Sequence, residues 1–411
     1  MKIIFWSSLF MIFYAYFGYV IILIVIDMYQ RVQKGKIFLS GSTTTSQLLS
    51  DKELPQISFI ITAYNEEQRI AQKIENSLEQ TYPAEKLEVI VASDCSTDQT
   101  DEIVRGYASY NVKLIRASER KGKENAQMYA VRAALGTILV FSDVATILKP
   151  DALKQIVSNF EDPLVGCVSS EDRFIDSDGH VSGEGLYVKY EMFIRKLESR
   201  VNTLVGLSGS FFAVRQDVCR DWAPDLQSDF NSLLNSVKLG MKGISDPLSI
   251  GYYKNIADER KEFQRKVRTV LRGITVLIRN RFLLNPRKYG LFSWQLMSHK
   301  ISRWLVPLFM IIVFATNIAL LDNSVIYMTI FFLQISFYAA AVFHVFQLKT
   351  SKVKWSKAED NLNAFKTVIK SIFTQVPRIA YYFVSVNASI LWAWIKFFYG
   401  ERATLWDPSK R

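Results

Sequence analysis

The sequence predicts an α/β domain, with a mostly parallel sheet, between segments that cross a membrane. Apolar residues make up 49% of the 411-residue chain and are concentrated at its two ends, whereas the middle is mixed and charged. Between Ile57 and about Ile250, short apolar runs alternate with stretches of helical periodicity. Such alternation is typical of a mostly parallel sheet with helices on both faces. Ligands of such sheets bind beyond the carboxyl ends of the strands.

Two kinds of sequence pattern support this prediction. Short apolar runs predict strands at Ile57–Ile61, Leu87–Val91 and Ile138–Phe141. Helical periodicity predicts helices at Glu67–Gln80, Asp98–Ala108 and Glu124–Ala134.

The first predicted membrane span runs from Phe5 to Ile26 and is almost wholly apolar. At about 1.5 Å per helical residue, it can cross a hydrocarbon core of about 30 Å. Arg31, Lys34 and Lys36 follow it, and cationic flanks are typical of the cytoplasmic side of a span. We therefore expect the α/β domain in the cytoplasm, after a linker rich in Ser and Thr.

Three further segments have a composition that suits a membrane. Trp304–Leu321 and Val325–Phe346 are joined by a loop without Lys or Arg and are followed by lysines, which predicts a hairpin with both ends in the cytoplasm. Ile379–Ile395 is shorter and contains Asn387, so it can span, re-enter or lie at the interface. Glu259–Arg281 has apolar residues at helical spacing among many cations, which fits an interfacial helix or a helix packed on the domain.

The formal net charge of +11 favours an anionic partner. Because Lys and Arg crowd beside the apolar segments, we expect lipid headgroups or the usual cytoplasmic charge bias rather than nucleic acid. The three cysteines, Cys95, Cys167 and Cys219, are far apart, and we interpret them as structural. The three histidines are too dispersed for a His-rich metal site.

Polar residues follow the first two predicted strands. In ISFIITAYNEE, which ends at Glu67, a strand runs into a polar loop whose backbone can hold a planar base. Glu66 of this loop can accept hydrogen bonds from ribose hydroxyls. In VASDCSTDQT, Asp94 stands at a strand end and can accept a hydrogen bond from a pyrimidine ring N–H. Helix capping explains the later Ser, Thr and Asp of that block, and it does not explain Asp94.

Two further blocks suit a diphosphate and a cation. In ERKGKENA, Arg120 and Lys123 lie on either side of Gly122, on a turn before a helix. This arrangement suits a pyrophosphate, although a solvated run of charges has the same pattern. In ILVFSDVAT, a strand ends in Asp143, whose carboxylate suits Mg²⁺ or Mn²⁺. An ordinary aspartate in a turn is the alternative.

In order and spacing, these four blocks together resemble the family 2 glycosyltransferases, over about Ile57 to Arg268. The resemblance implies inverting chemistry on a Rossmann-like, nucleotide-sugar-binding domain of the GT-A type with flanking transmembrane helices. It also implies a nucleotide site lined by Thr62, Ala63, Glu66 and Asp94, with Arg120 and Lys123 as the basic element before the third helix.

By the same resemblance, Asp143 matches the first Asp of the metal-binding Asp-x-Asp, and Ala145 replaces the second. The resemblance therefore implies Mg²⁺ or Mn²⁺ held by one carboxylate together with the diphosphate of the donor, and it leaves the number of protein ligands open. The expected donor is a nucleotide-diphosphate sugar, with UDP as the nucleotide.

Two later blocks extend the resemblance. LSGSFFAVR is similar to the acceptor-side loop, and its Gly209 would let the backbone approach a sugar closely. QSDFNSLLNSVKLG is similar to the segment that carries the catalytic base, a position that Asp229 occupies. A helix N-cap is the alternative role for Asp229.

FQRKVRT, Phe263 to Thr269, partly resembles the Gln-x-x-Arg-Trp element of polysaccharide synthases. Arg268 stands at the Arg position and is expected to contact phosphate. Thr269 replaces the Trp, which weakens the case for a processive enzyme.

We therefore expect inverting transfer of the sugar to a membrane lipid, or to a lipid-linked glycan or polyprenyl phosphate, by a multi-pass protein of the inner membrane. A processive polysaccharide synthase is one alternative. A catalytically silent scaffold that binds nucleotide sugars is another alternative. Such a protein needs no complete metal site, so it could lack the second metal-binding Asp.

The sequence thus divides the chain into seven expected segments. They are a transmembrane anchor (1–30), a linker (31–54), the cytoplasmic glycosyltransferase domain (55–255), amphipathic interfacial helices (256–300), a transmembrane hairpin (301–347), a cytoplasmic basic segment (348–378), and a membrane-embedded or interfacial segment with a basic tail (379–411).

Overall fold

The structure is a computed structural model that describes residues 1–33, 48–175, 186–254, 259–350 and 364–405. The linker residues 34–47, the basic residues 351–363 and the tail 406–411, for which we made sequence predictions, lie outside this description. Contacts divide the chain into two compact units, which we describe separately. The helical unit comprises 1–19, 259–271 and 298–401, and the sheet unit comprises 20–258, 272–297 and 402–411.

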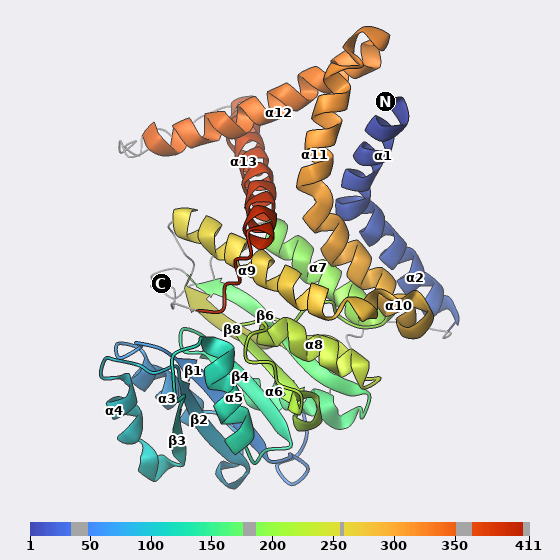
Figure 1. Cartoon of the computed structure of the whole chain (residues 1–411). Helices are drawn as coiled ribbons and strands as arrows, with labels where there is room; N and C mark the ends of the chain where they lie inside the picture. Colours follow the sequence, from blue (N-terminus) through green and yellow to red (C-terminus); the bar gives the residue numbers. More distant parts are fainter. Residues whose placement is uncertain (34–47, 176–185, 255–258, 351–363, 406–411) are drawn as a thin grey trace. The chain divides into compact units, whose positions relative to one another are not determined.

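The sheet unit is built on one eight-stranded sheet with the order β3-β2-β1-β4-β7-β6-β8-β5 (Figure 1). The strands are β1 (Ile57–Ala63), β2 (Leu87–Ser93), β3 (Val112–Arg116), β4 (Ile138–Asp143), β5 (Ile147–Leu148), β6 (Val165–Ile175), β7 (Phe211–Arg215) and β8 (Lys242–Lys254). All three strands that the apolar runs predict are present, each slightly longer than its run.

The sheet is mostly parallel, as expected, since four of its seven strand pairings are parallel, and β5 and β7 are the strands that run in the opposite direction. Strands β3, β2, β1 and β4 run parallel, whereas β7 is antiparallel to both of its neighbours, β4 and β6. The chain leaves β6 and enters β7 at the same edge of the sheet, so helix α7 (Leu186–Val201) between them makes no crossover. Periodicity alone does not reveal this, because strand–helix alternation looks the same with and without a crossover.

Helices cover both faces of the sheet, as the sequence predicts. Alternate residues of β1 point to opposite faces, so Phe59 packs in the cluster of α3 (Ile70–Leu78) and Ile60 packs in the cluster of α5 (Lys123–Ala133). The remaining helices of this unit include α4 (Thr100–Arg105), α6 (Ala152–Ser158), α8 (Ser228–Lys238) and α10 (Pro286–Leu296). Helices α2 (Tyr19–Gln33) and α9 (Glu259–Arg279) are shared between the two units.

The helical unit contains α1 (Lys2–Phe13), α11 (Ser302–Ile318), α12 (Val325–Thr350) and α13 (Ala364–Phe398). Three described stretches are helical, long and apolar enough to cross a membrane: Lys2–Gln33, Pro286–Ile318 and Val325–Phe346. They include the first predicted span and the predicted hairpin except for residues 319–321 at the end of its first helix. The second stretch begins inside the segment 256–300 expected to be interfacial, so that segment boundary stays a prediction.

The last predicted apolar segment, Ile379–Ile395, lies within α13. Its Asn387 is buried, and its side-chain amide donates to the backbone oxygen of Phe383 at 2.9 Å and to the hydroxyl of Tyr16 at 3.4 Å. These bonds satisfy the side-chain N–H groups, which would otherwise be costly in an apolar environment, whereas the side-chain oxygen has no hydrogen-bond partner among the described residues. That this segment spans the membrane, re-enters it or lies at its interface stays a prediction.

Candidate active site

Three adjacent parallel strands bring the predicted site residues to one edge of the sheet. Thr62 of β1 pairs in register with Asp143 of β4, and Ala63 pairs with Ser93 of β2. Asp94 follows directly, and its backbone N–H donates to the oxygen of Ala63 at 2.9 Å. The carboxyl ends of β1, β2 and β4 therefore form one polar edge, as expected for a ligand site in such a sheet.

Asp94 is fully buried and holds the loop before α5. Its carboxylate accepts hydrogen bonds from the backbone N–H groups of Lys121, at 3.1 Å, and Gly122, at 3.0 and 3.1 Å. Burial raises the pKa of Asp94, and these backbone donors partly offset the rise. The predicted contact of Asp94 with a pyrimidine stays a prediction, because the described partners of its carboxylate are backbone amides.

Gly122 occupies a backbone conformation that essentially only glycine adopts, with φ 105° and ψ 175°. A Cβ at this position would lie 2.2 Å from the backbone oxygen of Thr404. The segment Arg402–Leu405 near the C-terminus thus lies against the loop that Asp94 holds. Both belong to the sheet unit.

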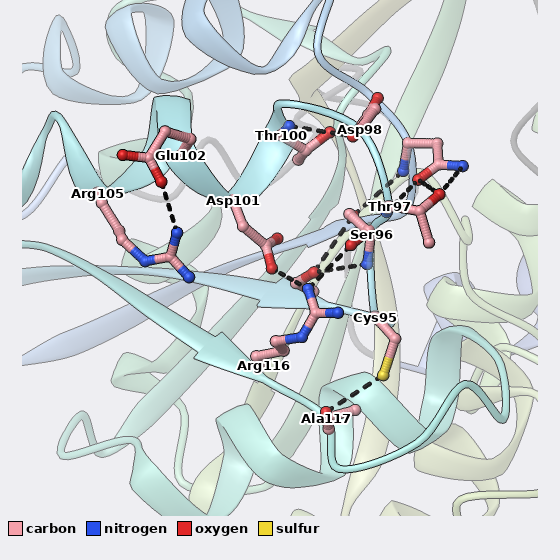
Figure 2. A network of polar contacts seen from close by, with 12 residues as sticks. Cys95, Ser96, Thr97, Asp98, Thr100, Asp101, Glu102, Arg105, Arg116 and Ala117 are labelled. Atoms are coloured by element: carbon pink, nitrogen blue, oxygen red, sulfur yellow. Dashed lines mark hydrogen bonds and ion pairs between the residues drawn. The ribbon is translucent and has the colours of Figure 1, made fainter.

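The connection after β2 is fixed by a polar network (Figure 2). Arg116, the last residue of β3, forms an ion pair with Asp101 and donates to the backbone oxygen of Ser96 at 2.9 Å. The thiol of Cys95, a residue with φ 58°, donates to the oxygen of Ala117 at 3.2 Å. These contacts anchor the chain immediately after Asp94, which fits the structural role predicted for Cys95.

Glu66 and Thr62 lie beside the same edge. Glu66 is buried and forms an ion pair with Arg69 at 2.6 Å. Burial raises the pKa of Glu66, while Arg69 opposes the rise. The hydroxyl of Thr62 is buried and has no hydrogen-bond partner among the residues that the structure describes. A buried hydroxyl without a partner is uncommon and is compatible with a ligand-binding role.

Arg120 is exposed, and its guanidinium lies 3.9 Å from the centroid of the Tyr64 ring. At this distance the positive charge and the ring face attract each other, which helps to hold the arginine side chain in place. This geometry suits the predicted role of Arg120 beside a nucleotide.

Lys123 is the central cation of the site. Its ammonium donates to the carboxylate of Asp143 at 2.5 Å and to the backbone oxygen of Gly209 at 3.1 Å. Lys123, only 9% exposed, thereby connects the predicted metal-binding residue with the predicted acceptor-side loop. Both contacts join segments that are far apart in the sequence.

The donor set for a metal is small. No group of three or more His, Cys, Asp or Glu side chains that could hold an ion is present among the described residues. Asp143 supplies one carboxylate, and Ala145 supplies none. These residues therefore fit a divalent ion whose other ligands come from a diphosphate, and they do not fit an ion caged by protein alone.

Asp229 lies in the first turn of α8 and is 9% exposed. The N-cap of α8 is Gln227, so the alternative role of Asp229 as the N-cap does not apply. Its carboxylate accepts hydrogen bonds from the backbone N–H of Phe230 at 2.8 Å and the side-chain amide of Gln227 at 3.1 Å. Burial raises its pKa, although the charges of Lys123 and Arg272 oppose the rise.

Gly209 and Asp229 lie side by side. A Cβ on Gly209 would be 2.8 Å from the carboxylate oxygen of Asp229. A side chain at position 209 would therefore force the Asp229 carboxylate to shift. Lys123 thus has Asp143 on one side and the Gly209–Asp229 pair on the other.

The sequence motifs did not point to an ion pair between Glu124 and Arg272, whose side chains are 3% and 13% exposed. Glu124 also accepts the backbone N–H of Ser228 at 3.4 Å, so the pair supports the start of α8 next to Asp229. No sequence pattern marks this pair, because its two residues are far apart in the chain. Arg268 itself lies in the helical unit, so its predicted contact with phosphate stays a prediction.

Residues 58–222 match the model of the glycosyl transferase family 2. The chain contains a family 2 glycosyltransferase domain. This confirms the family that the sequence motifs suggested. The match covers the strands that carry Thr62, Asp94 and Asp143, and it ends before Asp229.

Relatives are found among bacteria and archaea. The poly-β-1,6-N-acetyl-D-glucosamine synthase of Staphylococcus aureus (strain COL) is 26% identical over 253 residues, which cover 58% of this chain and 60% of the synthase. The glycosyltransferase AglE of Haloferax volcanii is 30% identical over 175 residues, which cover 42% of this chain and 56% of that protein. The chain thus spans less than two thirds of the length of these relatives.

A solved structure shares the fold over nearly the whole chain. It is the mannosyltransferase PcManGT from Pyrobaculum calidifontis, in complex with GDP-Man and Mn²⁺. Its TM-score is 0.68 at 18% identity, and the alignment covers 97% of this chain and 99% of that one. The predicted fold class, a GT-A type domain with flanking apolar helices, is confirmed.

Proposed function

We propose that this protein transfers a sugar, with inversion, from a nucleotide-diphosphate sugar to a lipid or lipid-linked acceptor. The observation that carries the proposal is the position of Lys123. It contacts Asp143, where a diphosphate and its cation are expected, and Gly209, which lies against Asp229. A donor subsite and a proton acceptor are therefore adjacent.

The donor would lie along the polar edge of the sheet. Its base and ribose would lie near Asp94, Glu66 and the Arg120–Tyr64 pair, and UDP is the nucleotide that the resemblance implies. Lys123 would turn from Asp143 to the diphosphate when a cation takes its place on that carboxylate. Mg²⁺ or Mn²⁺ on Asp143 would supply neutralising charge to the departing diphosphate.

The chemical step would be a single displacement. The acceptor hydroxyl oxygen forms a bond to the anomeric carbon, while the bond from that carbon to the diphosphate oxygen breaks on the opposite face. The nucleoside diphosphate leaves with the bonding electrons, and the acceptor proton passes to Asp229. Burial makes the Asp229 carboxylate a stronger base, provided that it is ionised at the working pH.

The acceptor is proposed from the membrane character of the chain. Three described helical stretches can cross a bilayer by length and composition. An enzyme held at a membrane has ready access to polyprenyl phosphates and lipid-linked glycans. The cationic flanks support a multi-pass protein of the inner membrane with its catalytic domain on the cytoplasmic face.

A processive polysaccharide synthase is the second candidate. It is favoured by the similarity to the staphylococcal poly-β-1,6-N-acetyl-D-glucosamine synthases. Thr269, in place of the Trp that such enzymes carry, argues against it. A catalytically silent scaffold is supported only by Ala145, which replaces the second metal-binding Asp.

A panel of radiolabelled UDP- and GDP-sugars, offered to membranes containing the protein, tests the proposal. We expect one donor to label a lipid-extractable product of defined size. Long polymer formed from the donor alone would favour a processive synthase. Nucleotide binding without transfer from any donor would favour the scaffold.

A further inference from the structure

Lys73 is a lysine of α3 that no part of the proposed reaction uses. Its side chain is completely buried, with 0% exposure. The ammonium donates to the hydroxyl of Ser142 at 2.9 Å and to the backbone oxygen of Thr146 at 2.6 Å. It also lies 5.3 Å from the centroid of the Phe59 ring. Two oxygens and one aromatic face thus surround a group with three N–H donors.

A buried ammonium is unusual enough to need an explanation. Moving a charged group out of water is costly, and lysines are almost never fully buried unless paired. Among the described residues, no carboxylate lies within ion-pair distance of the Lys73 ammonium. Burial lowers its pKa to about 7, an effect that the charge of Asp143 opposes. A leucine or methionine would fill this position in α3 at lower cost.

The two oxygens that Lys73 binds lie on either side of Asp143. Ser142 precedes Asp143 in β4, and Thr146 closes the following turn by donating its backbone N–H to the oxygen of Asp143 at 3.2 Å. The backbone N–H of Asp143 is held separately by the oxygen of Ser210 at 3.0 Å. Lys73 therefore holds the turn from the side of the hydrophobic core.

Ala145 makes this support important. With no second carboxylate in the turn, a divalent ion depends on the placement of Asp143 alone. A small shift of the turn would then displace the Asp143 carboxylate from the position at which it meets the ion.

We propose that Lys73 is a positioning residue, which fixes the turn 142–146 so that Asp143 meets the divalent ion and the donor diphosphate. The inference rests on the proposed function of Asp143. Lys73 itself does not touch the donor, because the turn lies between them.

The matched control is Lys86, which also uses its ammonium to hold backbone oxygens. It donates to the oxygens of Asp51, Lys52 and Leu54 at 2.8 to 2.9 Å. Lys86 precedes β2, at the opposite end of the strand from Asp94. Lys73→Met and Lys86→Met thus each remove an ammonium that holds a backbone oxygen, and only the first of these ammoniums is beside Asp143.

The experiment measures binding of UDP, and separately of GDP, to the full-length purified protein by calorimetry over a range of Mn²⁺ concentrations. Lys73→Met should raise the Mn²⁺ concentration for half-maximal nucleotide binding by about tenfold, while Lys86→Met leaves it unchanged. Transfer assays should show the same increase in the Mn²⁺ requirement. Lys73→Gln, which keeps a donor, should lie between Lys73→Met and the unaltered protein.

If Lys73→Met does not fold, Ser142→Ala replaces it, because it removes only one of the two contacts and should raise the Mn²⁺ requirement by a smaller factor. An unchanged or lower Mn²⁺ requirement in the folded variants would overturn the positioning role and leave Lys73 a support of the fold. Failure of the unaltered protein to bind either nucleotide would instead overturn the proposed function, and the role of Lys73 with it.

Discussion

At the scale of single residues, burial is the feature that most changes the chemistry of Asp229. Its carboxylate lies in a helix start, has two hydrogen-bond donors and is almost enclosed. The N-terminus of α8 and the nearby cations favour the charged form, and removal from water disfavours it. Burial prevails, so the pKa is raised above the ordinary value of 3.8.

The pH dependence of transfer should follow from this shift. A general base works only when ionised, so activity is lost as the pH falls through the pKa of Asp229. Because that pKa is raised, we expect kcat/KM to decline at a pH above that of an exposed aspartate. Rates measured from pH 4 to pH 8 should show this acid limb, and the residual activity of Asp229→Asn should lack it. An identical limb in the variant would assign the titration to another group.

Asp143 should be the residue on which metal dependence rests. A bound cation stabilises the leaving diphosphate by several kcal/mol, so Asp143→Asn should lower transfer by about 10²-fold or more. Excess EDTA should have a similar effect on the unaltered protein, and added Mn²⁺ should restore it. Full activity in excess chelator would show that Lys123 and the other cations suffice without an ion.

At the scale of elements, the conformation of the loop between β3 and α5 depends on Gly122. A substitution of this glycine tests whether the loop contributes to nucleotide binding. In Gly122→Ala, the backbone strain and the collision with Thr404 would displace the amides that bind Asp94. We expect the Kd for the nucleotide to rise at least about tenfold, since one lost bond to a charged group costs about 1.5–3 kcal/mol.

Gly240→Ala is the control for this loop variant. Gly240 also has a positive φ, 76°, yet a Cβ there would meet nothing within 4 Å. It should lower thermal stability through backbone strain and leave nucleotide binding intact. Equal effects of the two variants on binding would mean that the loop has no special role.

Sequence patterns predicted the strands and helices of the donor site better than the side-chain contacts between them. Asp94 and Asp143 could be placed because each follows an apolar run, and such runs end at one edge of a parallel sheet. The burial of Lys73 could not be read from the sequence, because Ile70 precedes it by three residues but the residue four positions later, Ser77, is polar although buried. Other contacts, such as Arg272 with Glu124, join residues far apart in the chain and follow from tertiary structure alone.

At the scale of the whole molecule, the orientation in the membrane decides where the donor must be. Cationic flanks predict that the chain after the first span is cytoplasmic and that the loop around Asp322 is outside. In a Cys95→Ser background, single cysteines at Lys52 and at Asp322 should react oppositely with an impermeant thiol reagent applied to intact cells. Labelling of the Lys52 site from outside would place the catalytic domain on the other face.

The measurement that tests the central claim most directly is transfer by Asp229→Asn at saturating donor and acceptor. General base catalysis contributes typically about 10²–10⁴-fold, so kcat should fall by that factor. Donor binding should be retained, because Asp94, Glu66 and Asp143 are unchanged. Near-normal turnover by the folded variant would contradict the account and remove Asp229 from the mechanism.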